Sequence, residues 1–464
     1  MSPYVKASGL LFSTALLVAS SAALATVNKP SATTSSPLSR VRMIRRNTLP
    51  QHVIVVVQEN RSVDNLFQGF PGADTQNYGL NSKNQKVPLT QIALGASYDP
   101  SHAHGAFVTE CNANLSGVCA MNGFDKEPCQ NCPANTAYTY VNPNDITQYT
   151  MLASQYGLAD HVLQPNEGPS QPGHVYLIAG QSGTIGTHWY MSENPLPRHS
   201  PPDDCLAQPN HTVLQIDMTT PYPGVEGNAV FPCIDPTPTI LDELDQKHIE
   251  WRYYTSGLGS IWTAPYAVKH LYDNAADRAR VIVPETNIIS DIKKNALQPV
   301  SYVIPSGHNS DHPGKDNNGG PAWVASIVNA VGANSNYWPN TVIFVVWDDW
   351  GGWYDHYVPS HPSNPFGGTP DPYEYGFRVP LLAIGMTAKN AVDHTPRSSA
   401  AILHFIEDVF GLASLGTLDA QSDDLFGMFN FGSQYHAFKR IPTPGITPDT
   451  YLRRAPDTTP VDDD

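Results

Sequence analysis

The sequence predicts an α/β fold with a doubly wound, mostly parallel sheet that is flanked by helices and interrupted by long loop insertions. Two runs of β-branched and apolar residues, 53–57 and 342–346, are typical of strands buried on both faces, as in a parallel sheet. Segments with helical spacing of apolar residues alternate with further strand-like runs. The 42 prolines and the charged fraction of only 15% indicate long ordered loops between these elements.

The individual elements follow from local patterns. The segment 77–136 has no clear periodicity and is expected to be a loop. A tight turn at 166–169 leads into a short helix with Ser170 as its N-cap, and Pro172 is tolerated in the first turn of such a helix. Further strands are expected at 249–254, 302–305 and 379–386, and further helices at 146–156 (ended by Gly157), 240–244, 321–331 and 398–411 (capped by Ser398 and ended by Gly411).

The N-terminus has the pattern of an export signal. Lys6 precedes an apolar stretch of small residues, and 23–25 match a small-x-small cleavage site. We expect a signal peptide over 1–25, a flexible lead-in over 26–47, one domain over 48–442 and a loose tail over 443–464. An uncleaved N-terminal anchor is the alternative, and no later stretch is long and apolar enough to span a membrane. The protein is therefore expected in the periplasm or outside the cell.

Six cysteines follow the predicted signal peptide, which fits disulfides in an oxidising compartment. Cys205 and Cys233 would close one loop. The pairing of the other four, Cys111, Cys119, Cys129 and Cys132, stays open. The spacing of Cys129 and Cys132 is also that of half a zinc site, but no second such pair follows.

The formal net charge is −16, from 42 acidic and 26 basic residues. Nucleic acid is not the expected partner, because binding it requires clustered lysine and arginine. A small substrate that carries phosphate stays possible, because a metal ion can supply positive charge locally.

Polar residues follow both of the buried strands. Glu59 and Asn60 come after the first, and Asp348 and Asp349 after the second. The carboxyl ends of parallel strands meet at one edge of a sheet, where ligands bind in such folds. Buried carboxylates are costly unless a cation or hydrogen-bond donors take up their charge. The four residues therefore predict a metal site, with a simple Asp-Gly turn as the alternative for 348–352.

Ser170 has a second interpretation besides a helix cap. A hydroxyl at the start of a helix lies near free backbone N–H groups and the positive end of the helix dipole. These features suit an activated nucleophile or an anion site.

Several motifs in order resemble the bacterial phosphoesterase family that contains phosphatidylcholine-type phospholipase C and a periplasmic acid phosphatase, within the alkaline-phosphatase-like superfamily. The resemblance covers most of the chain after the signal peptide and implies the alkaline-phosphatase-like fold. Its motifs are 58–64 (QENRSVD), 167–172 (EGPSQP), 310–313 (SDHP), 348–356 (DDWGGWYDH), 376–380 (GFRVP) and the helix 398–412.

The resemblance implies a phosphoester hydrolase that works through a covalent phosphoryl-serine. Ser170 would be the nucleophile, and one or more divalent metal ions would be the cofactor. The implied metal ligands are Glu59, Asn60, Asp348 and Asp349. The implied phosphate contacts or proton donors are His104, His312 and His356. His102 is an alternative to His104 in this role. Asp355 would either orient His356 or cap a turn.

The sequence departs from the family pattern at several places. Val63 and Asn65 replace an aromatic residue and a histidine, 173–174 are Gly-His where the phospholipase branch tends to have Asn-Arg, and 349–350 are Asp-Trp rather than Glu-His. The metal frame is intact, but the substrate stays open between phospholipase C-like diesters, with a phospholipid head group, and phosphomonoesters. The alternatives are a sulfate or phosphonate ester hydrolase, which the missing arginine of the sulfatase turn disfavours, and a secreted binding protein with a degenerate site.

Overall fold

The structure is a computed structural model. It describes residues 48–457, except for 115–117, 128, 130–131, 184–187, 197–204, 206–211, 218–224, 230–232, 315–317, 360–374 and 433–435. The predicted signal peptide (1–25) and lead-in (26–47) lie outside the described residues.

A nine-stranded sheet forms the centre of the described part of the chain, in the order β11–β10–β12–β1–β13–β14–β6–β15, with β16 paired to β6. The pairings make β14 antiparallel to both of its neighbours, and every other described pair in this sheet is parallel. The mostly parallel sheet predicted from the sequence is confirmed. The strands are β1 (His52–Gln58), β6 (Gly157–Leu163), β10 (Trp251–Tyr254), β11 (Val281–Ile282), β12 (Val300–Val303), β13 (Thr341–Trp347), β14 (Arg378–Gly385), β15 (Ala391–Asp393) and β16 (Arg397–Ser398).

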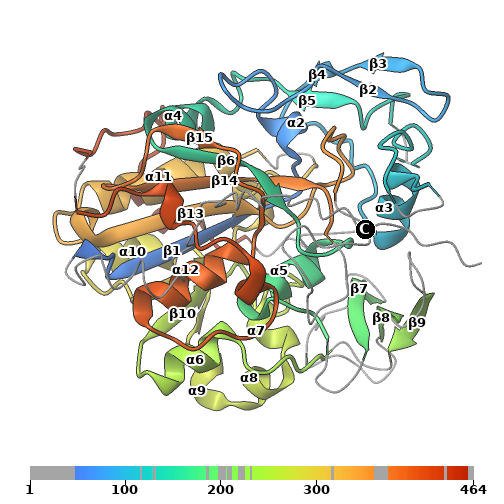
Figure 1. Cartoon of the computed structure of the whole chain (residues 1–464). Helices are drawn as coiled ribbons and strands as arrows, with labels where there is room; N and C mark the ends of the chain where they lie inside the picture. Colours follow the sequence, from blue (N-terminus) through green and yellow to red (C-terminus); the bar gives the residue numbers. More distant parts are fainter. Residues whose placement is uncertain are drawn as a thin grey trace, which may run out of the picture. The chain divides into compact units, whose positions relative to one another are not determined.

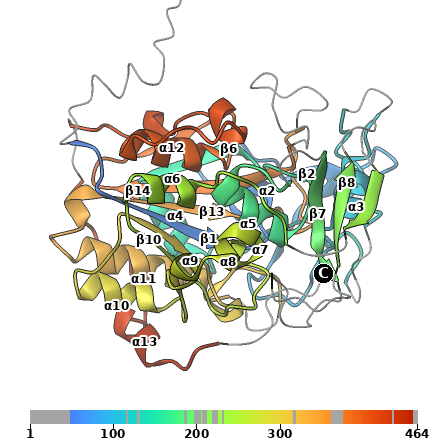
Figure 2. The ribbon, with the colours of Figure 1, turned by 90° about the horizontal axis from the view of Figure 1, so that it is seen from below.

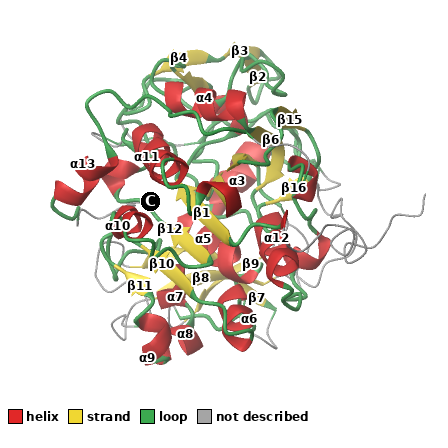
Figure 3. Cartoon of the chain, turned by 90° about the vertical axis from the view of Figure 1, so that its left-hand side faces the viewer, coloured by secondary structure: helices red, strands yellow, loops and turns green. Residues whose placement is uncertain are grey.

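Helices cover both faces of this sheet, as Figures 1 and 3 show. Because each face is covered, β13 is buried along its whole length and can consist entirely of apolar or aromatic residues and one threonine. One group of helices comprises α4 (Thr147–Gln155), α10 (Asn287–Lys293), α11 (Gly320–Gly332) and α13 (Pro448–Arg453). The other comprises α5 (Ser170–Ala179), α6 (Ile240–Gln246), α7 (Ala264–Ala267) and α12 (Ala401–Phe410), with α8 (Lys269–Asp273) and α9 (Ala275–Arg278) beside α7.

The long insertions gather at the end of the sheet toward which β1 points (Figures 1 and 2). They include the segment predicted to be a loop over 77–136, which in fact contains three short strands and a helix. Strands of three residues are too short to show a period in the sequence. The inserted elements are α2 (Val63–Leu66), β2 (Tyr78–Leu80), β3 (Lys86–Pro88), β4 (Thr90–Ile92), α3 (His104–Cys111), β5 (Thr139–Val141), β7 (Trp189–Leu196), β8 (Thr212–Asp217) and β9 (Val225–Ala229).

Four short 3-10 helices complete the described elements, at Gly307–Asn309, Trp338–Asn340, Leu418–Gln421 and Phe426–Met428.

The register of β1 with β13 positions the site. His52 lies opposite Thr341 and Gln58 opposite Trp347. Both strands therefore end side by side, and the polar residues after each of them leave the same edge of the sheet.

Two predicted helix starts are shifted in the structure. Ser170 is the first helical residue of α5 rather than its cap, because Pro169 occupies the N-cap position in an extended conformation. Ser398 belongs to β16, and α12 begins at Ala401. The predicted end of α12 at Gly411 is confirmed, with a left-handed φ of 65°.

Two further segments differ from expectation. Gly157 begins strand β6, which the sequence analysis missed because Asp160 and His161 interrupt its apolar pattern. The segment expected to be a loose tail contains α13, which is held by the burial of Tyr451 against Trp323, with ring centroids 4.8 Å apart.

All six cysteines are paired, as Cys111–Cys119, Cys129–Cys132 and Cys205–Cys233. The predicted disulfides are confirmed, and Cys129 and Cys132 bond to each other rather than forming half of a zinc site. Of the helices in the described part of the chain, none has the length and apolar character needed to cross a membrane.

Candidate active site

The residues that follow β1 and β13 interlock at the carboxyl edge of the sheet. The Asn60 N–H donates to Asp348 Oδ1 at 3.1 Å, and the Arg61 N–H donates to the Asp349 carbonyl at 3.0 Å. Asn60 and Gly351 both have left-handed φ values, 59° and 64°. A Cβ at Gly351 would lie 2.4 Å from the Asn60 carbonyl oxygen, so only glycine allows this close approach. The turn at 348–352 thus holds the predicted ligands in place.

Helix α5 brings Ser170 to this edge. Its Oγ donates to Asp349 Oδ2 at 3.2 Å, and the side chain is fully buried. The helix approaches β13 closely, because a Cβ at Gly173 would lie 3.0 Å from the Asp348 carbonyl oxygen. Ser170 is the first residue of the helix, so its hydroxyl lies at the positive end of the helix dipole. The helix N-terminus expected from the sequence is thus present at this serine, and the structure adds a carboxylate partner, Asp349.

His174 joins the same group, which the sequence analysis did not predict. It lies four residues after Ser170 and therefore on the same face of α5. Its Nε2 is 3.3 Å from Glu59 Oε1 and 3.6 Å from Asp348 Oδ2. Glu59, His174 and Asp348 each offer a ligand atom within 4.8 Å of the others, and all three are buried. The sequence signal that could have found it is the four-residue spacing between Ser170 and His174 on one helix face.

This group suits a divalent cation. Among the described residues, Asn60 Oδ1 and Asp348 Oδ2 have no hydrogen-bond donor although both atoms are buried. Buried oxygen acceptors without donors are costly, and a cation removes that cost. Carboxylate oxygens with one imidazole suit zinc and neighbouring transition metals. Of the four predicted ligands, Glu59 and Asp348 belong to the group with His174, and Asn60 and Asp349 adjoin it.

His102 contacts this group directly. Its Nε2 lies 2.8 Å from Asn60 Nδ2 and 4.0 Å from Asp349 Oδ2. The ring of His312 is next to it, with centroids 6.2 Å apart. His102 therefore lies next to the candidate metal ligands, and His312 lies next to His102.

His104 is the first residue of α3 and contacts the loop that leads to Ser170. Its Nδ1 is 3.1 Å from the Glu167 carbonyl oxygen, and its backbone N–H donates to Glu193 Oε1 at 2.9 Å. His104 thus contacts the turn that precedes the serine, whereas His102 contacts the candidate metal ligands.

The motif at 310–313 is tied to the end of β1. Arg61 donates from Nε and Nη2 to the Asp311 carbonyl, at 3.0 and 2.7 Å. Asp311 Oδ2 accepts from Tyr149 Oη at 2.8 Å and from Trp347 Nε1 at 3.1 Å. Burial raises the pKa of Asp311 to about 6, and burial lowers the pKa of Arg61 to about 10. These contacts position the neighbouring His312.

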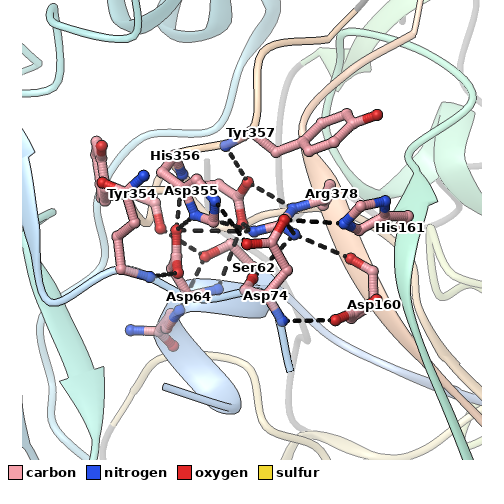
Figure 4. Close-up of polar contacts among 12 residues, drawn as sticks. Ser62, Asp64, Asp74, Asp160, His161, Tyr354, Asp355, His356, Tyr357 and Arg378 are labelled. Carbon is pink, nitrogen blue, oxygen red and sulfur yellow. Dashed lines mark hydrogen bonds and ion pairs between the residues drawn. The ribbon is translucent and has the colours of Figure 1, made fainter. Parts of the chain in front are cut away.

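His356 lies in a second polar cluster, shown in Figure 4. Its Nδ1 is 2.6 Å from Asp64 Oδ2, which also accepts from its backbone N–H at 2.7 Å. Burial lowers the pKa of His356, but the hydrogen bond to Asp64 and the charge of Asp355 outweigh this effect and raise it. Asp355 itself pairs with Arg378, at 2.8 Å from Nε and 3.1 Å from Nη2, and accepts from the Tyr357 N–H.

Asp64, rather than Asp355, therefore orients His356, and Asp355 caps a turn. Within the described interactions, the structure does not bring His356 into contact with Ser170 or its neighbours. Its role as a phosphate contact or proton donor stays a prediction.

The fold and the site define a class of protein. It is an α/β protein in which the carboxyl edge of the sheet joins a buried serine to a group of carboxylates and an imidazole that can bind a metal. Residues 50–413 match the model of the phosphoesterase family. The chain belongs to this family, so the resemblance found in the sequence is confirmed. The enzyme class expected from the sequence, a hydrolase acting on phosphoester bonds, is that of the family.

Curated relatives are similar over most of the chain. The hemolytic phospholipase C of Pseudomonas aeruginosa is 23% identical, over 84% of this chain and 57% of its own. Phospholipase C A of Mycobacterium tuberculosis is 22% identical, over 82% of this chain and 78% of its own. The chain thus spans little more than half of the Pseudomonas protein. Among solved structures, a protein in the alkaline phosphatase superfamily from Vibrio parahaemolyticus has a TM-score of 0.36 at 12% identity, over 81% of this chain and 70% of that one.

Proposed function

We propose that this protein is an exported, metal-dependent phosphodiesterase of the phospholipase C type that hydrolyses its substrate through a phosphoryl-Ser170 intermediate. The observation that carries the proposal is the 3.2 Å contact between Ser170 Oγ and Asp349 Oδ2 at the start of α5, next to Glu59, Asp348 and His174. The names of the relatives favour a diester with a phospholipid head group over a phosphomonoester.

Glu59, Asp348 and His174 would hold the ion, with Asn60 and Asp349 beside them. When bound, it would supply positive charge that favours the ionised serine and the developing charge on the phosphoryl oxygens. The serine hydroxyl is already oriented, because Asp349 Oδ2 accepts its hydrogen bond and can take its proton. Fixing the hydroxyl in this way removes an entropic cost of reaching the transition state.

The remaining steps belong to neighbouring side chains. Ser170 Oγ forms a bond to phosphorus while the bond to the leaving alcohol breaks, and that alcohol takes a proton from a nearby histidine. His102, which contacts Asn60 and Asp349, and His312, whose ring lies next to that of His102, are proposed for this role and for binding phosphoryl oxygens. Water then cleaves the phosphoserine and restores the hydroxyl.

Export is proposed from two features. The N-terminal 25 residues have the pattern of a signal peptide, and the three disulfides are typical of an oxidising compartment. The protein is thus expected in the periplasm or outside the cell. Detection of the mature chain, starting near Thr26, outside the cytoplasm tests this part of the proposal.

Hydrolysis of p-nitrophenyl phosphorylcholine and p-nitrophenyl phosphate tests the mechanism and the substrate class together. We expect turnover of the choline diester, its loss after treatment with a chelator, and a fall of about 1,000-fold or more in Ser170→Ala. Ser301→Ala is the matched control, because this serine is equally buried, on β12. Full turnover by Ser170→Ala would exclude the serine route, full turnover after chelation would exclude the metal, and turnover of the monoester alone would replace the diester as substrate.

A further inference from the structure

Strand β6 has an irregularity that places two potential metal ligands together. Val162 lies opposite Val379 and Ala159 opposite Leu381, so Asp160 and His161 both face the single residue between them, Pro380. Proline lacks the N–H needed for a regular ladder and occurs at such bulges. A β-bulge re-aims a side chain, whereas neighbouring side chains in a regular strand point to opposite faces. This explains how adjacent residues of one strand can serve one site.

His394, between β15 and β16, completes a group of three. Its Nδ1 is 2.8 Å from Asp160 Oδ1 and 3.1 Å from Oδ2. The rings of His394 and His161 have centroids 5.4 Å apart. Ligand atoms of Asp160, His161 and His394 all lie within 4.8 Å of one another. The ligands of a tetrahedral zinc ion are about 3.3 Å apart, since each is about 2.0 Å from the metal. Only a small adjustment is needed to reach that spacing.

Arg378 is the permanent cation beside this group, and it touches the group at the backbone rather than at the Asp160 carboxylate: its Nη1 donates to the Asp160 carbonyl at 3.1 Å and lies 3.7 Å from Asp74 Oδ2. Arg378 is buried and makes its two carboxylate hydrogen bonds to Asp355. His356 pairs with Asp64. Figure 4 shows Arg378 between the His356–Asp64 pair and Asp160, with a contact to Asp160. The carboxylate of Asp160 has the N–H of Asp74 and the imidazole of His394 as its partners.

Asp74 contacts both His161, of the proposed group, and His356, of the neighbouring polar cluster. Its Oδ2 is 2.9 Å from His161 Nε2, and its Oδ1 is 3.3 Å from His356 Nε2. A carboxylate that holds an imidazole in this way is the usual partner of a metal-binding histidine. His394 has 51% of its side chain exposed, whereas Asp160 has none, so the group is anchored inside and open to solvent on one side.

We propose that Asp160, His161 and His394 bind a second divalent ion of the zinc class, with Asp74 as the residue that positions His161. Two imidazoles with a carboxylate form a donor set that zinc and its neighbours prefer over magnesium or calcium. The site is not part of the Ser170 group. Strand β14 separates β6 from β13, which puts about 10 Å between them at the usual strand spacing. The ion would join the loop after α2, strand β6 and the β15–β16 connection, and so stabilise this edge of the sheet.

Counting bound zinc in the full protein tests the site. After equilibration with zinc and removal of the unbound ion, the double variant His161→Asn/His394→Asn should hold one zinc fewer per chain than the unaltered protein. It should also lose the part of the zinc-dependent rise in Tm that this site supplies. Hydrolysis of the phosphate esters should be unchanged. His188→Asn is the matched control, because His188 is 53% exposed and lies 3.5 Å from Asp217.

Equal zinc content in the double variant and the unaltered protein would mean that the cluster is an ion-pair network only, and would overturn the proposal. If the variant fails to fold, anomalous scattering at the zinc edge from crystals of the unaltered protein decides the question. A peak between Asp160, His161 and His394 is expected, and its absence at saturating zinc would overturn the site. Asp74→Asn should weaken zinc binding about 10- to 100-fold. These measurements need no substrate, so they stand apart from the proposed activity.

Discussion

Replacing His174 tests the candidate metal centre most directly. Its Nε2 lies 3.3 Å from Glu59 Oε1 and 3.6 Å from Asp348 Oδ2. Ligands about 2.1 Å from one ion are about 3.0 Å apart in an octahedron and about 3.4 Å apart in a tetrahedron. Both distances from His174 are close to these values, so His174 can share an ion with Glu59 and Asp348 without movement of α5. In His174→Asn the shorter side chain cannot reach the position of the imidazole nitrogen.

The expected loss in metal affinity is about 100-fold or more. Mutation of groups that only support a ligand already costs 10- to 100-fold, so removal of a ligand should reach at least the upper end of that range. A factor of about 100 corresponds to about 2.8 kcal/mol of binding free energy. The maximal rate at saturating metal should recover in part, because Ser170 and Asp349 are unchanged.

The assay is the recovery of ester hydrolysis when a divalent metal is titrated into chelator-treated enzyme. The midpoint for His174→Asn should shift by about two orders of magnitude from that of the unaltered enzyme. His104→Asn is the control, because His104 contacts Glu167 rather than Glu59 or Asp348, and its midpoint should not move. An unshifted midpoint with a lower maximal rate would place His174 on the substrate and refute its role as a ligand.

Two stability predictions follow from ionisable groups outside the site. Burial, with the nearby charge of Asp419, raises the pKa of Glu407 from 4.5 to about 9, so ionising Glu407 destabilises the fold increasingly as the pH rises through that range. Glu407→Gln should raise Tm at pH 8 and leave it unchanged at pH 4.5; equal shifts at both pH values would contradict this. Burial lowers the pKa of His270, but hydrogen bonds to Asp242 and Asp235 outweigh this and raise it from 6.5 to about 9. The stability from its protonation is complete below pH 6.5 and is lost as the pH rises through 9. Thermal melts should show His270→Asn with a lower Tm at pH 6 and with an unchanged Tm at pH 10, and a pH-independent loss would refute the charge as its cause.

The central sheet could be predicted because its middle strands are apolar along their length. β1 and β13 are buried on both faces, so their sequences report their environment directly. β6 could not be found in the same way. Asp160 and His161 lie in its middle, and the bulge that accommodates them is set by Pro380 on a neighbouring strand that comes much later in the chain. A pattern within one segment cannot report such a partner.

The site residues also fall into two kinds, those that the sequence predicts and those that only the packing reveals. Glu59, Asn60, Asp348 and Asp349 follow predictable strands, so their meeting at one edge could be inferred from the sequence. The partner of His356 could not, because Asp64 and Asp355 are both plausible neighbours in sequence motifs and only the packing selects Asp64.

Positions 173 and 174 show how a departure from a family pattern can be one linked change. Gly173 lets α5 approach β13, since even a Cβ there would lie 3.0 Å from the Asp348 carbonyl oxygen. That approach is what brings His174 within 3.6 Å of the Asp348 carboxylate. A larger residue in place of Gly173 would crowd the Asp348 carbonyl and hold α5 further from β13. We therefore expect Gly173 and His174 to act together: Gly173 sets the approach of α5, and His174 places an imidazole beside Glu59 and Asp348.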